Sequence, residues 1–445
     1  MLKNLLKKIL PKTTLKKIRP FWHGFLASAA AFRNGFPSKQ LVVIGITGTA
    51  GKSTTVQMLA KIMNDSGLKT GYVTTVGYSV NGDVFNKNKI SLSMPSGPVL
   101  QSRLLDMIDA GCKYAVIEAT SEGLAQNRHF GIDFDMALLT NLHPAHLDSH
   151  GDFESYKRAK GRLFKAVSAS MRKEFFPAKI IGLNLDSADF GYFAGFKADK
   201  KFAVTSALNE EKSLMATAAG IKNIYILEDI KATAEGSNFK ISNQEFKIGV
   251  PGEFNVWNAL LAASAANMLG VELAKSAEAL TNFKIIGRME EIDSVKGFKV
   301  FIDYAPEPIA MENSLQAVSG MPHKRVVHVF GSTGGHRDVG KRQEFGKISA
   351  TYADKIIITN DDVYESDPVK IAEEIKNGID AIASVKNIEV KTILDRGEAI
   401  RIAIAEAEEG DIILITGKGS ENFLVLPGDK RIDWDEHKLV ETLLR

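Results

Sequence analysis

Leu41-Val42-Val43-Ile44-Gly45-Ile46-Thr47-Gly48-Thr49-Ala50-Gly51-Lys52-Ser53-Thr54-Thr55 is the stretch that decides the fold. Its apolar run predicts a buried strand, its glycines a sharp turn, and its lysine and hydroxyls the first turn of a helix. Such a turn aims backbone N–H groups at an anion, and the helix N-terminus adds partial positive charge. We therefore predict a phosphate-binding loop in which Lys52 reaches the outer phosphates of a nucleotide and Ser53 or Thr54 holds Mg²⁺.

The loop departs from the general phosphate-binding pattern at one position. That pattern has a glycine five residues before Gly51, where this chain has Ile46. The match is therefore to a shorter form, Gly48-x-x-Gly51-Lys52-Ser53.

Length and composition bound the remaining possibilities. A chain of 445 residues with 44% hydrophobic residues can form two or three domains, each with a full core. No apolar run is long enough to cross a bilayer, and the one cysteine, Cys112, excludes an intrachain disulfide. These features predict a cytoplasmic protein.

Charge is unevenly distributed along the chain. The net charge is only +3, yet no Asp or Glu precedes Asp65, and Lys and Arg are concentrated in residues 1–20. Apolar residues at helical spacing between these lysines predict a short basic amphipathic helix that ends at Pro11. Two interpretations stay open: the helix makes a peripheral contact with anionic lipid at the inner face of the membrane, or it docks on the chain's own core.

Strands and helices alternate from Leu41 onward, which predicts an α/β fold with a mostly parallel sheet and its ligand at the carboxyl ends of the strands. Further strands are expected at 70–76, 114–118 and 136–140, with an antiparallel extension between residues 180 and 250. A second α/β unit has five expected strands, at 300–304, 325–330, 355–359, 388–390 and 412–416. We expect a basic segment at 1–40, an ATP-binding domain at 41–285 and a Rossmann-like C-terminal domain at 286–445.

Two polar segments follow expected strands of the first α/β unit. Glu118 ends one strand, where a carboxylate can hold Mg²⁺, although it could also cap a helix. The loop at 140–151 contains His143, His146 and His150, and imidazoles so concentrated suit a metal or a transferring phosphate. In the helix that follows, the residues alone identify Lys160 as a solvated surface lysine.

Together these segments resemble the Mur ligase family, ATP-dependent amide-bond-forming enzymes of peptidoglycan synthesis, and especially its members that add the third residue of the stem peptide. The resemblance runs from Leu41 to the C-terminus. Its motifs fall on Thr47–Thr54, Glu118–Ser121, Thr140–Leu142, His146–Gly151, Ala159–Lys160, Gly252–Asn258, Gly287–Glu290, Asp303–Ala305, Phe330–Arg342, Thr359–Pro368 and Gly417–Glu421.

The resemblance implies roles for individual residues, most of which lie in these motifs. The catalytic residues would be Lys52, Glu118, His146, Lys160 and Arg288. ATP would contact Gly48, Thr49, Gly51, Lys52, Ser53, Thr54, Asn255, Asn258, Arg288 and Asp303. Mg²⁺ would be held by Ser53, Glu118, His146 and a carbamylated Lys160. The acceptor and the amino acid would contact Ser121, Arg128, Arg342, Asp361, Asp362, Tyr364 and Glu421.

Several positions depart from the family pattern. Only forty residues precede the loop, so the family's UDP-sugar-binding first domain is not expected, and a partner could supply an acceptor-binding domain. Pro306 and Ser420 replace histidines. Asp361-Asp362-Val363-Tyr364 replaces Asp-Asn-Pro-Arg, so the arginine that would clamp a distal carboxylate of diaminopimelate is a tyrosine here.

The resemblance implies that the γ-phosphate of ATP passes to an acceptor carboxylate and that an amine then displaces phosphate to form an amide. The acceptor would be a muropeptide, with lipid-linked, folate-like and poly-amino-acid carboxylates as alternatives. A different class of function, a degenerate nucleotide-sensing partner protein, fits less well, because Lys52, Glu118, His146 and Lys160 are all retained. No nucleic acid partner is expected.

Overall fold

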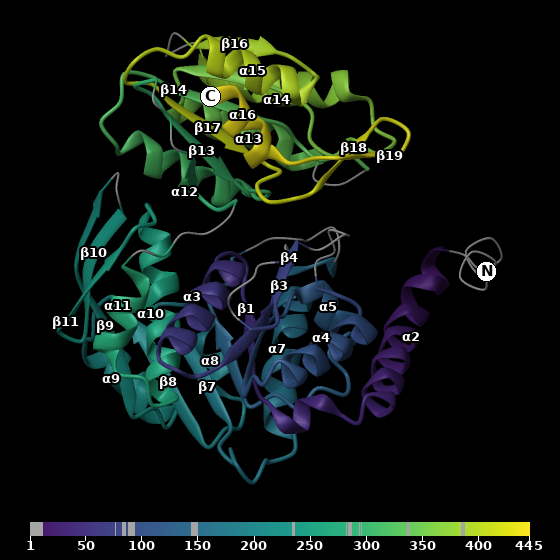
Figure 1. The fold of residues 1–445 in the computed structure, drawn as a ribbon, viewed down its shortest axis with the longest axis vertical. Coiled ribbons are helices and arrows are strands. Elements are labelled where there is room, and N and C mark those ends of the chain that lie inside the picture. The colour runs from purple at the N-terminus through teal and green to yellow at the C-terminus, as the bar shows by residue number, and fades with distance from the viewer. Residues whose placement is uncertain are drawn as a thin grey trace. The chain divides into compact units, whose positions relative to one another are not determined.

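The computed structural model describes residues 12–75, 77–81, 86–87, 94–143, 150–233, 236–281, 283, 287–292, 294, 296–335, 339–383 and 388–445 (Figure 1). These residues form two compact units. The first takes in the described parts of Met1–Asp229 together with Phe239–Phe246 and Trp257–Leu280, and the second takes in Ile230–Asn238, Lys247–Val256 and Thr281–Arg445. The α/β fold class expected from the sequence is confirmed.

An eleven-stranded sheet has the order β11-β10-β9-β8-β7-β6-β1-β5-β2-β3-β4. Its strands are β1 (Val42–Thr47), β2 (Thr70–Val73), β3 (Gly77–Ser79), β4 (Asn86–Lys87), β5 (Tyr114–Glu118), β6 (Met136–Leu139), β7 (Ile180–Asn184), β8 (Lys200–Thr205), β9 (Asn223–Thr233), β10 (Gly236–Ile241) and β11 (Gln244–Ile248). β1 pairs in parallel with β5 and with β6. The loop after β1 therefore lies between the carboxyl ends of those two strands.

Helices join these strands and cover the sheet (Figure 1). They are α2 (Lys12–Arg33), the 3₁₀ turn η1 (Pro37–Gln40), α3 (Lys52–Asp65), α4 (Gly97–Asp109), α5 (Ser121–Ala125), α7 (Phe153–Ala169), α8 (Phe190–Ala194), α9 (Glu210–Ala218), α10 (Glu253–Met268) and α11 (Leu273–Leu280). The core between helices and sheet is apolar, with Val43, Ile117 and Leu163 among its fully buried members.

The antiparallel extension expected from residue 180 onward is wrong for its first three strands. β7 pairs in parallel with β6, β8 with β7, and β9 with β8. α8 and α9 lie between these strands in the sequence and provide the crossovers that parallel pairing requires. The sequence pattern missed them because α8 has only five residues and α9 has little apolar periodicity.

The N-terminal segment is described only from Lys12 onward. Residues 1–11, on which the short amphipathic helix was predicted, lie outside the described residues. From Lys12 the chain forms one helix to Arg33 and continues through Pro20. Across the described residues, no helix combines the length and the apolar character needed to span a bilayer.

The second unit contains a six-stranded sheet with the order β12-β13-β17-β14-β15-β16. Its strands are β12 (Glu290–Ile292), β13 (Lys299–Asp303), β14 (Val326–Phe330), β15 (Lys355–Ile358), β16 (Glu389–Thr392) and β17 (Ile412–Thr416), with β18 (Phe423–Leu426) and β19 (Lys430–Asp433) as a separate hairpin. Its helices are α12 (Pro308–Ser319), α13 (Val339–Tyr352), α14 (Pro368–Ala383), α15 (Arg396–Ala405) and α16 (Glu436–Leu444). β13, β17, β14, β15 and β16 are mutually parallel, so their carboxyl ends share one edge.

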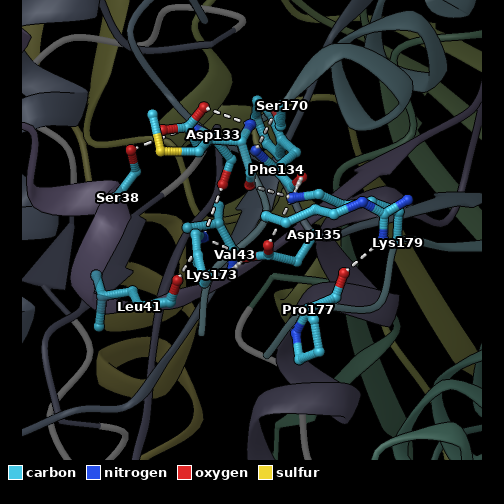
Figure 2. A network of polar contacts seen from close by, with 12 residues as sticks. Ser38, Leu41, Val43, Asp133, Phe134, Asp135, Ser170, Lys173, Pro177 and Lys179 are labelled. Atoms are coloured by element: carbon cyan, nitrogen blue, oxygen red, sulfur yellow. Dashed lines mark hydrogen bonds and ion pairs between the residues drawn. The ribbon is translucent and has the colours of Figure 1, made fainter. Parts of the chain in front are cut away.

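A buried ion network fixes the opposite, amino-terminal ends of β1, β6 and β7 (Figure 2). The carboxylate of Asp135, which is fully buried, accepts a hydrogen bond from the backbone N–H of Val43 at 2.8 Å. It also accepts from the ammonium groups of Lys173 and Lys179, the latter at 2.9 Å. Each ammonium donates further to backbone carbonyls, that of Lys173 to Leu41 and that of Lys179 to Phe134. One carboxylate thus compensates two buried cations.

Asp135→Ala should lower the free energy of unfolding of the first unit by about 3–5 kcal/mol, because it leaves two buried ammonium groups without a counter-charge. Urea unfolding followed by tryptophan fluorescence in a Trp434→Phe background checks this, since Trp22 and Trp257 both belong to that unit.

The matched control is Asp65→Ala, which removes the exposed partner of Lys61. Its expected cost is about 0.3–0.5 kcal/mol. Equal costs for the two substitutions would show that the Asp135 network does not stabilise this sheet.

Candidate active site

The loop between β1 and α3 passes so close to neighbouring chain that only glycine fits at two of its positions. Gly48 has φ +153° and Gly51 has φ +78°. A Cβ on Gly48 would lie 1.9 Å from Oγ1 of Thr140, and one on Gly51 would lie 2.1 Å from Oδ1 of Asn258. The two glycines therefore allow both the turn and the close approach of the loop to the end of β6 and to α10.

The segment after β6 holds this loop in place. The backbone carbonyl of Asn141 accepts from the N–H of Thr49 at 3.0 Å, and its side-chain oxygen accepts from the N–H of Ala50 at 2.9 Å. The hydroxyl of Thr140 donates to the carbonyl of Ala50 at 2.7 Å. On the other side of the loop, the Thr49 hydroxyl lies 3.0 Å from the hydroxyl of Tyr156 on α7.

Lys52 and Ser53 open α3, as expected for a phosphate-binding loop. Nζ of Lys52 donates to the carbonyl of Thr49 at 2.9 Å. The Ser53 hydroxyl donates to a carboxylate oxygen of Glu118 at 2.7 Å, and that oxygen also accepts from the N–H of Thr75 at 2.9 Å. Glu118 and Ser53 are both buried, so two oxygen groups of the kind that Mg²⁺ prefers meet beside the loop.

Glu118 does not cap the helix that follows it. The N-cap of α5 is Thr120, whose hydroxyl accepts from the N–H of Gly123 at 3.2 Å. The helix-capping alternative for Glu118 is therefore wrong.

Lys160 is not the solvated surface lysine that its sequence context indicated. It is 1% exposed, and Nζ donates to the carbonyl of Gly48 at 2.6 Å while lying 4.3 Å from the ring centre of Tyr156. Burial, together with the nearby charge of Lys52, sets the pKa of Lys160 well below its usual value, and Glu118 opposes this only in part. The helical pattern misled because α7 turns its polar Lys160 inward, beneath the loop.

The histidine-rich segment is only partly described. His146, the expected metal ligand, lies outside the described residues together with 144, 145 and 147–149. The backbone of His143 donates to Oγ1 of Thr49, and the ring of His150 lies 3.1 Å from the hydroxyl of Ser121. In the described part of the chain, His, Cys, Asp and Glu nowhere gather in a group of three that could hold a metal ion. The ligand set therefore stays a prediction.

Three further predicted contacts of the first α/β domain have partners within the protein. The Asn258 side chain lies against Gly51 and accepts from the hydroxyl of Thr55 at 3.3 Å. Asn255 donates to the carbonyl of Pro251 at 2.8 Å. Arg128 is buried, contacts the carbonyl of Met94 and the side chain of Gln126, and has its pKa lowered mainly by burial. Their roles with ATP or substrate stay predictions.

In the second unit, Arg288 and Asp303 lie near the carboxyl end of β13, and each has its own hydrogen-bond partners. The Arg288 guanidinium donates to the carbonyl of Tyr304 at 2.5 Å and lies over the ring of that residue. Asp303 accepts from the N–H of Met289 at 3.0 Å and from the hydroxyl of Ser314 at 2.5 Å. Burial raises the pKa of Asp303, although the charge of Arg288 opposes this.

An acidic cluster surrounds one buried lysine at the carboxyl ends of β15 and β17. Nζ of Lys418 lies 2.9 Å from Asp362, 2.5 Å from Glu421 and 3.9 Å from Asp361. Burial alone would lower the pKa of Lys418, but these carboxylates outweigh burial and raise it. Burial and the charge of Asp361 raise the pKa of Asp362. The buried guanidinium of Arg396 also interacts with Asp361 and Asp362 but is paired with Glu436, so the three carboxylates around Lys418 leave an excess of negative charge.

Tyr364 lies in the loop after β15, and Arg342 lies in the first turn of α13 in the same unit. Tyr364 has φ +51°, a left-handed conformation that a tyrosine rarely adopts, and its ring lies against Gly335. Arg342 pairs with Glu374 at 2.6 Å and donates to the carbonyl of Thr333 at 3.3 Å. Both stay predicted substrate contacts.

Three residues that organise the site had no individual role predicted from the sequence, although Asn141 and Lys418 lie in matched motifs. Asn141 clamps the loop, Lys418 holds the acidic cluster together, and Tyr156 contacts both Thr49 and Lys160. The available signal for Asn141 and Lys418 was their place just after buried parallel strands, where site residues gather. Tyr156 has no such signal, because it looks like an ordinary core residue of an amphipathic helix.

Comparison with known proteins gives a consistent result over most of the chain. Residues 46–266 match the Mur ligase middle domain, and residues 287–419 match the Mur ligase glutamate ligase domain. A UDP-N-acetylmuramyl-tripeptide synthetase from Roseiflexus is 35% identical over 420 residues, which cover 92% of this chain and 80% of the relative. A UDP-N-acetylmuramoyl-L-alanyl-D-glutamate–2,6-diaminopimelate ligase from Caldanaerobacter subterraneus is 34% identical, with 94% of this chain and 80% of the relative covered.

A solved structure of a UDP-N-acetylmuramoyl-L-alanyl-D-glutamate–2,6-diaminopimelate ligase aligns with a TM-score of 0.59 and 28% identity. The alignment covers 91% of this chain and 78% of that one.

Gly51→Ala should weaken nucleotide binding at least about tenfold, or about 1.4 kcal/mol, because the new Cβ displaces either the loop or Asn258. Titration with a fluorescent ATP analogue measures the change in Kd.

Gly67→Ala is the matched control, since Gly67 also has positive φ, +81°, but no atom lies within 4 Å of its Cβ position. Both substitutions should cost about 1–2 kcal/mol in backbone strain. Equal nucleotide affinity in the two variants would contradict the importance of the close approach at Gly51.

Proposed function

The chain belongs to the Mur ligase family of ATP-dependent amide ligases, and we propose that it joins an amino acid to the carboxylate of a peptidoglycan precursor through an acyl phosphate. The observation that carries the proposal is the convergence of Lys52, the Ser53–Glu118 pair and buried Lys160 on one phosphate-binding loop. A protein that only senses nucleotide needs the loop and Lys52 but has no use for a second lysine buried beneath the loop.

The reaction proceeds in two displacements. A carboxylate oxygen of the acceptor attacks the γ-phosphorus of ATP, and the bond to the β–γ bridging oxygen breaks to release ADP. An amine, having lost a proton, then attacks the acyl carbon, and phosphate leaves with the former carboxylate oxygen. Lys52 and the N–H groups at the start of α3 stabilise the charge that builds on the phosphate oxygens.

We propose Ser53, Glu118, His146 and a carbamylated Lys160 as the residues that hold Mg²⁺. The donors fit, because the hydroxyl and carboxylate oxygens of Ser53 and Glu118 are 2.7 Å apart and buried. A Mg²⁺ ion held by these residues would neutralise charge on the phosphate oxygens. The lowered pKa of Lys160 favours its neutral amine, which is the form that can add to CO₂, and the resulting carbamate changes a cation into an anionic oxygen ligand.

The acidic cluster of the second unit is our proposed site for the incoming amino acid. Its excess negative charge suits an ammonium group, with Asp361, Asp362 and Glu421 as its contacts. Tyr364 stands where an arginine would recognise a distal carboxylate. We therefore propose an amino acid other than diaminopimelate. We retain residues 41–285 and 286–445 as the two domains that divide these roles.

The acceptor is proposed to be a UDP-linked muramoyl dipeptide, as the names of the relatives indicate for those proteins. A lipid-linked muropeptide is the second candidate, favoured by the concentration of lysines in residues 1–20. Folate-like and poly-amino-acid carboxylates are the remaining alternatives. A partner that supplies an acceptor-binding domain is compatible with each of them.

Phosphate release from ATP, measured across a panel of amino acids, should depend on both an amino acid and UDP-N-acetylmuramoyl-dipeptide. The reason is that an acyl phosphate forms only when a carboxylate is bound, and it turns over productively only when an amine is present. The control is Lys52→Ala, which should abolish release under every condition. Release that never responds to the UDP-dipeptide would refute this acceptor and leave the lipid-linked one.

Activity should rise when bicarbonate is added to enzyme that has been depleted of CO₂, because the carbamate of Lys160 then re-forms. A carbamate carbon signal should appear in ¹³C NMR spectra of enzyme incubated with ¹³C-bicarbonate. Lys160→Ala should lose both the signal and at least about two orders of magnitude in kcat, a loss typical of removing one electrostatic contact to the transition state. Lys165→Ala, on the same helix, is the control. A wild-type enzyme without the carbamate signal would contradict the modification.

A further inference from the structure

Helix α2 has the reverse of the usual arrangement for a helix at a protein surface. The residues that it buries against the first unit are small: Gly24, Ala27 and Ala31. Five of the residues that it exposes are large and apolar. They are Ile18, Phe21, Trp22, Phe25 and Phe32, and the exposed fractions of Phe21, Phe25 and Phe32 are 78%, 65% and 76%.

The exposed apolar residues form a stripe along one side of the helix, with Ile18, Phe21, Trp22 and Phe25 together and Phe32 two turns farther on. Their spacing of three, four or seven residues places them within about 100° of helix circumference, on the side away from Ala27. The rings of Trp22 and Phe25 are stacked, with centroids 6.2 Å apart. A helix inside a folded protein normally buries such a stripe, so its exposure calls for an outside partner.

The orientation of α2 on the first unit is fixed by close packing on its small face. A Cβ on Gly97 would meet Cβ of Ala27 at 2.2 Å, and one on Gly131 would meet Cβ of Ala31 at 2.5 Å. The side chain of Asn127 donates to the carbonyl of Pro20 at 3.3 Å. Figure 1 shows α2 on the outside of the first unit, alongside α4. Because the small face is held this tightly, α2 cannot roll to bury its aromatic stripe without losing these contacts.

Charge indicates what covers the stripe. Residues 1–33 contain eight Lys and Arg and no Asp or Glu. Among the described side chains, Arg19 and Arg33 are exposed near the two ends of the stripe. A second copy of the chain would bring the same cations together and repel, whereas an anionic lipid surface attracts each of them. Tryptophan and phenylalanine on one helix face with cations around them are typical of helices that lie in the bilayer interface.

We propose that α2 docks the first unit on an anionic membrane surface, with Phe21, Trp22, Phe25 and Phe32 inserted at the level of the lipid headgroups. The proposal concerns a different surface from the nucleotide loop and does not depend on the identity of the acceptor. Its effect would be to hold a ligase at the membrane, where lipid-linked compounds are found.

Co-sedimentation of the full chain with vesicles tests the proposal. Binding should be strong to phosphatidylcholine mixed with phosphatidylglycerol, weak to phosphatidylcholine alone, and reduced by high salt. The combined substitutions Phe21→Gln, Trp22→Gln and Phe25→Gln should lower the partition constant at least about tenfold, because each inserted aromatic contributes to it. The matched control replaces three equally exposed apolar residues elsewhere on this unit, Met171→Gln, Phe175→Gln and Leu214→Gln, and should bind as the wild type does.

Brominated acyl chains should quench the fluorescence of Trp22 in the bound protein, and a Trp22→Phe variant should lose this quenching while still binding. Urea midpoints confirm that each variant folds. The proposal is overturned if the wild-type protein does not bind anionic vesicles, or if both triple variants lose vesicle binding equally. It is also overturned if the stripe instead mediates a concentration-dependent dimer or retains a purified protein partner.

Discussion

The close approach of the Gly48–Gly51 loop to the end of β6 is the constraint on which the candidate site depends. β1 lies between β5 and β6, so the loop that leaves β1 has Glu118 on one side and Thr140 with Asn141 on the other. Glycine at position 48 lets the backbone pass Thr140, and glycine at position 51 lets it pass Asn258 on α10. The same closeness brings the carbonyl of Gly48 to Lys160, which explains why a lysine can be buried on α7.

Each unit contains a buried lysine, and the pKa values of these two lysines shift in opposite directions. Lys160 has one carboxylate in its electrostatic surroundings, and burial and the charge of Lys52 dominate, so the pKa falls and the neutral amine is favoured. Lys418 is ringed by Asp361, Asp362 and Glu421, so the pKa rises and the ammonium is retained. A neutral amine suits chemical modification, whereas a permanent cation suits a structural role within a cluster of carboxylates. Burial alone therefore does not determine what a lysine can do.

Much of this arrangement follows from local sequence. The strand before the loop, the position of Lys52 and Ser53 at the start of α3, and the parallel strands that end at Glu118 and Leu139 are all marked by apolar runs and glycines. What the sequence could not show is which polar residues turn inward. Lys160 and Tyr156 lie on an ordinary amphipathic helix, and their burial depends on where α7 docks. The parallel pairing of β7, β8 and β9 could not be predicted for a different reason. The helices that connect these strands, α8 and α9, are too short or too weakly patterned to be identified as crossovers.

The central claim is that the reaction passes through an acyl phosphate, and the most direct test traces an oxygen isotope from the acceptor carboxylate to the released phosphate. If the loop directs attack of an acceptor carboxylate on the γ-phosphorus, then an acceptor labelled with ¹⁸O in its carboxylate must transfer one labelled oxygen to the released phosphate. Mass spectrometry of phosphate after turnover with a labelled UDP-N-acetylmuramoyl-dipeptide and the amino acid that supports release measures this. The account predicts ¹⁸O in the phosphate. Unlabelled phosphate formed together with amide product would show that the reaction bypasses an acyl phosphate.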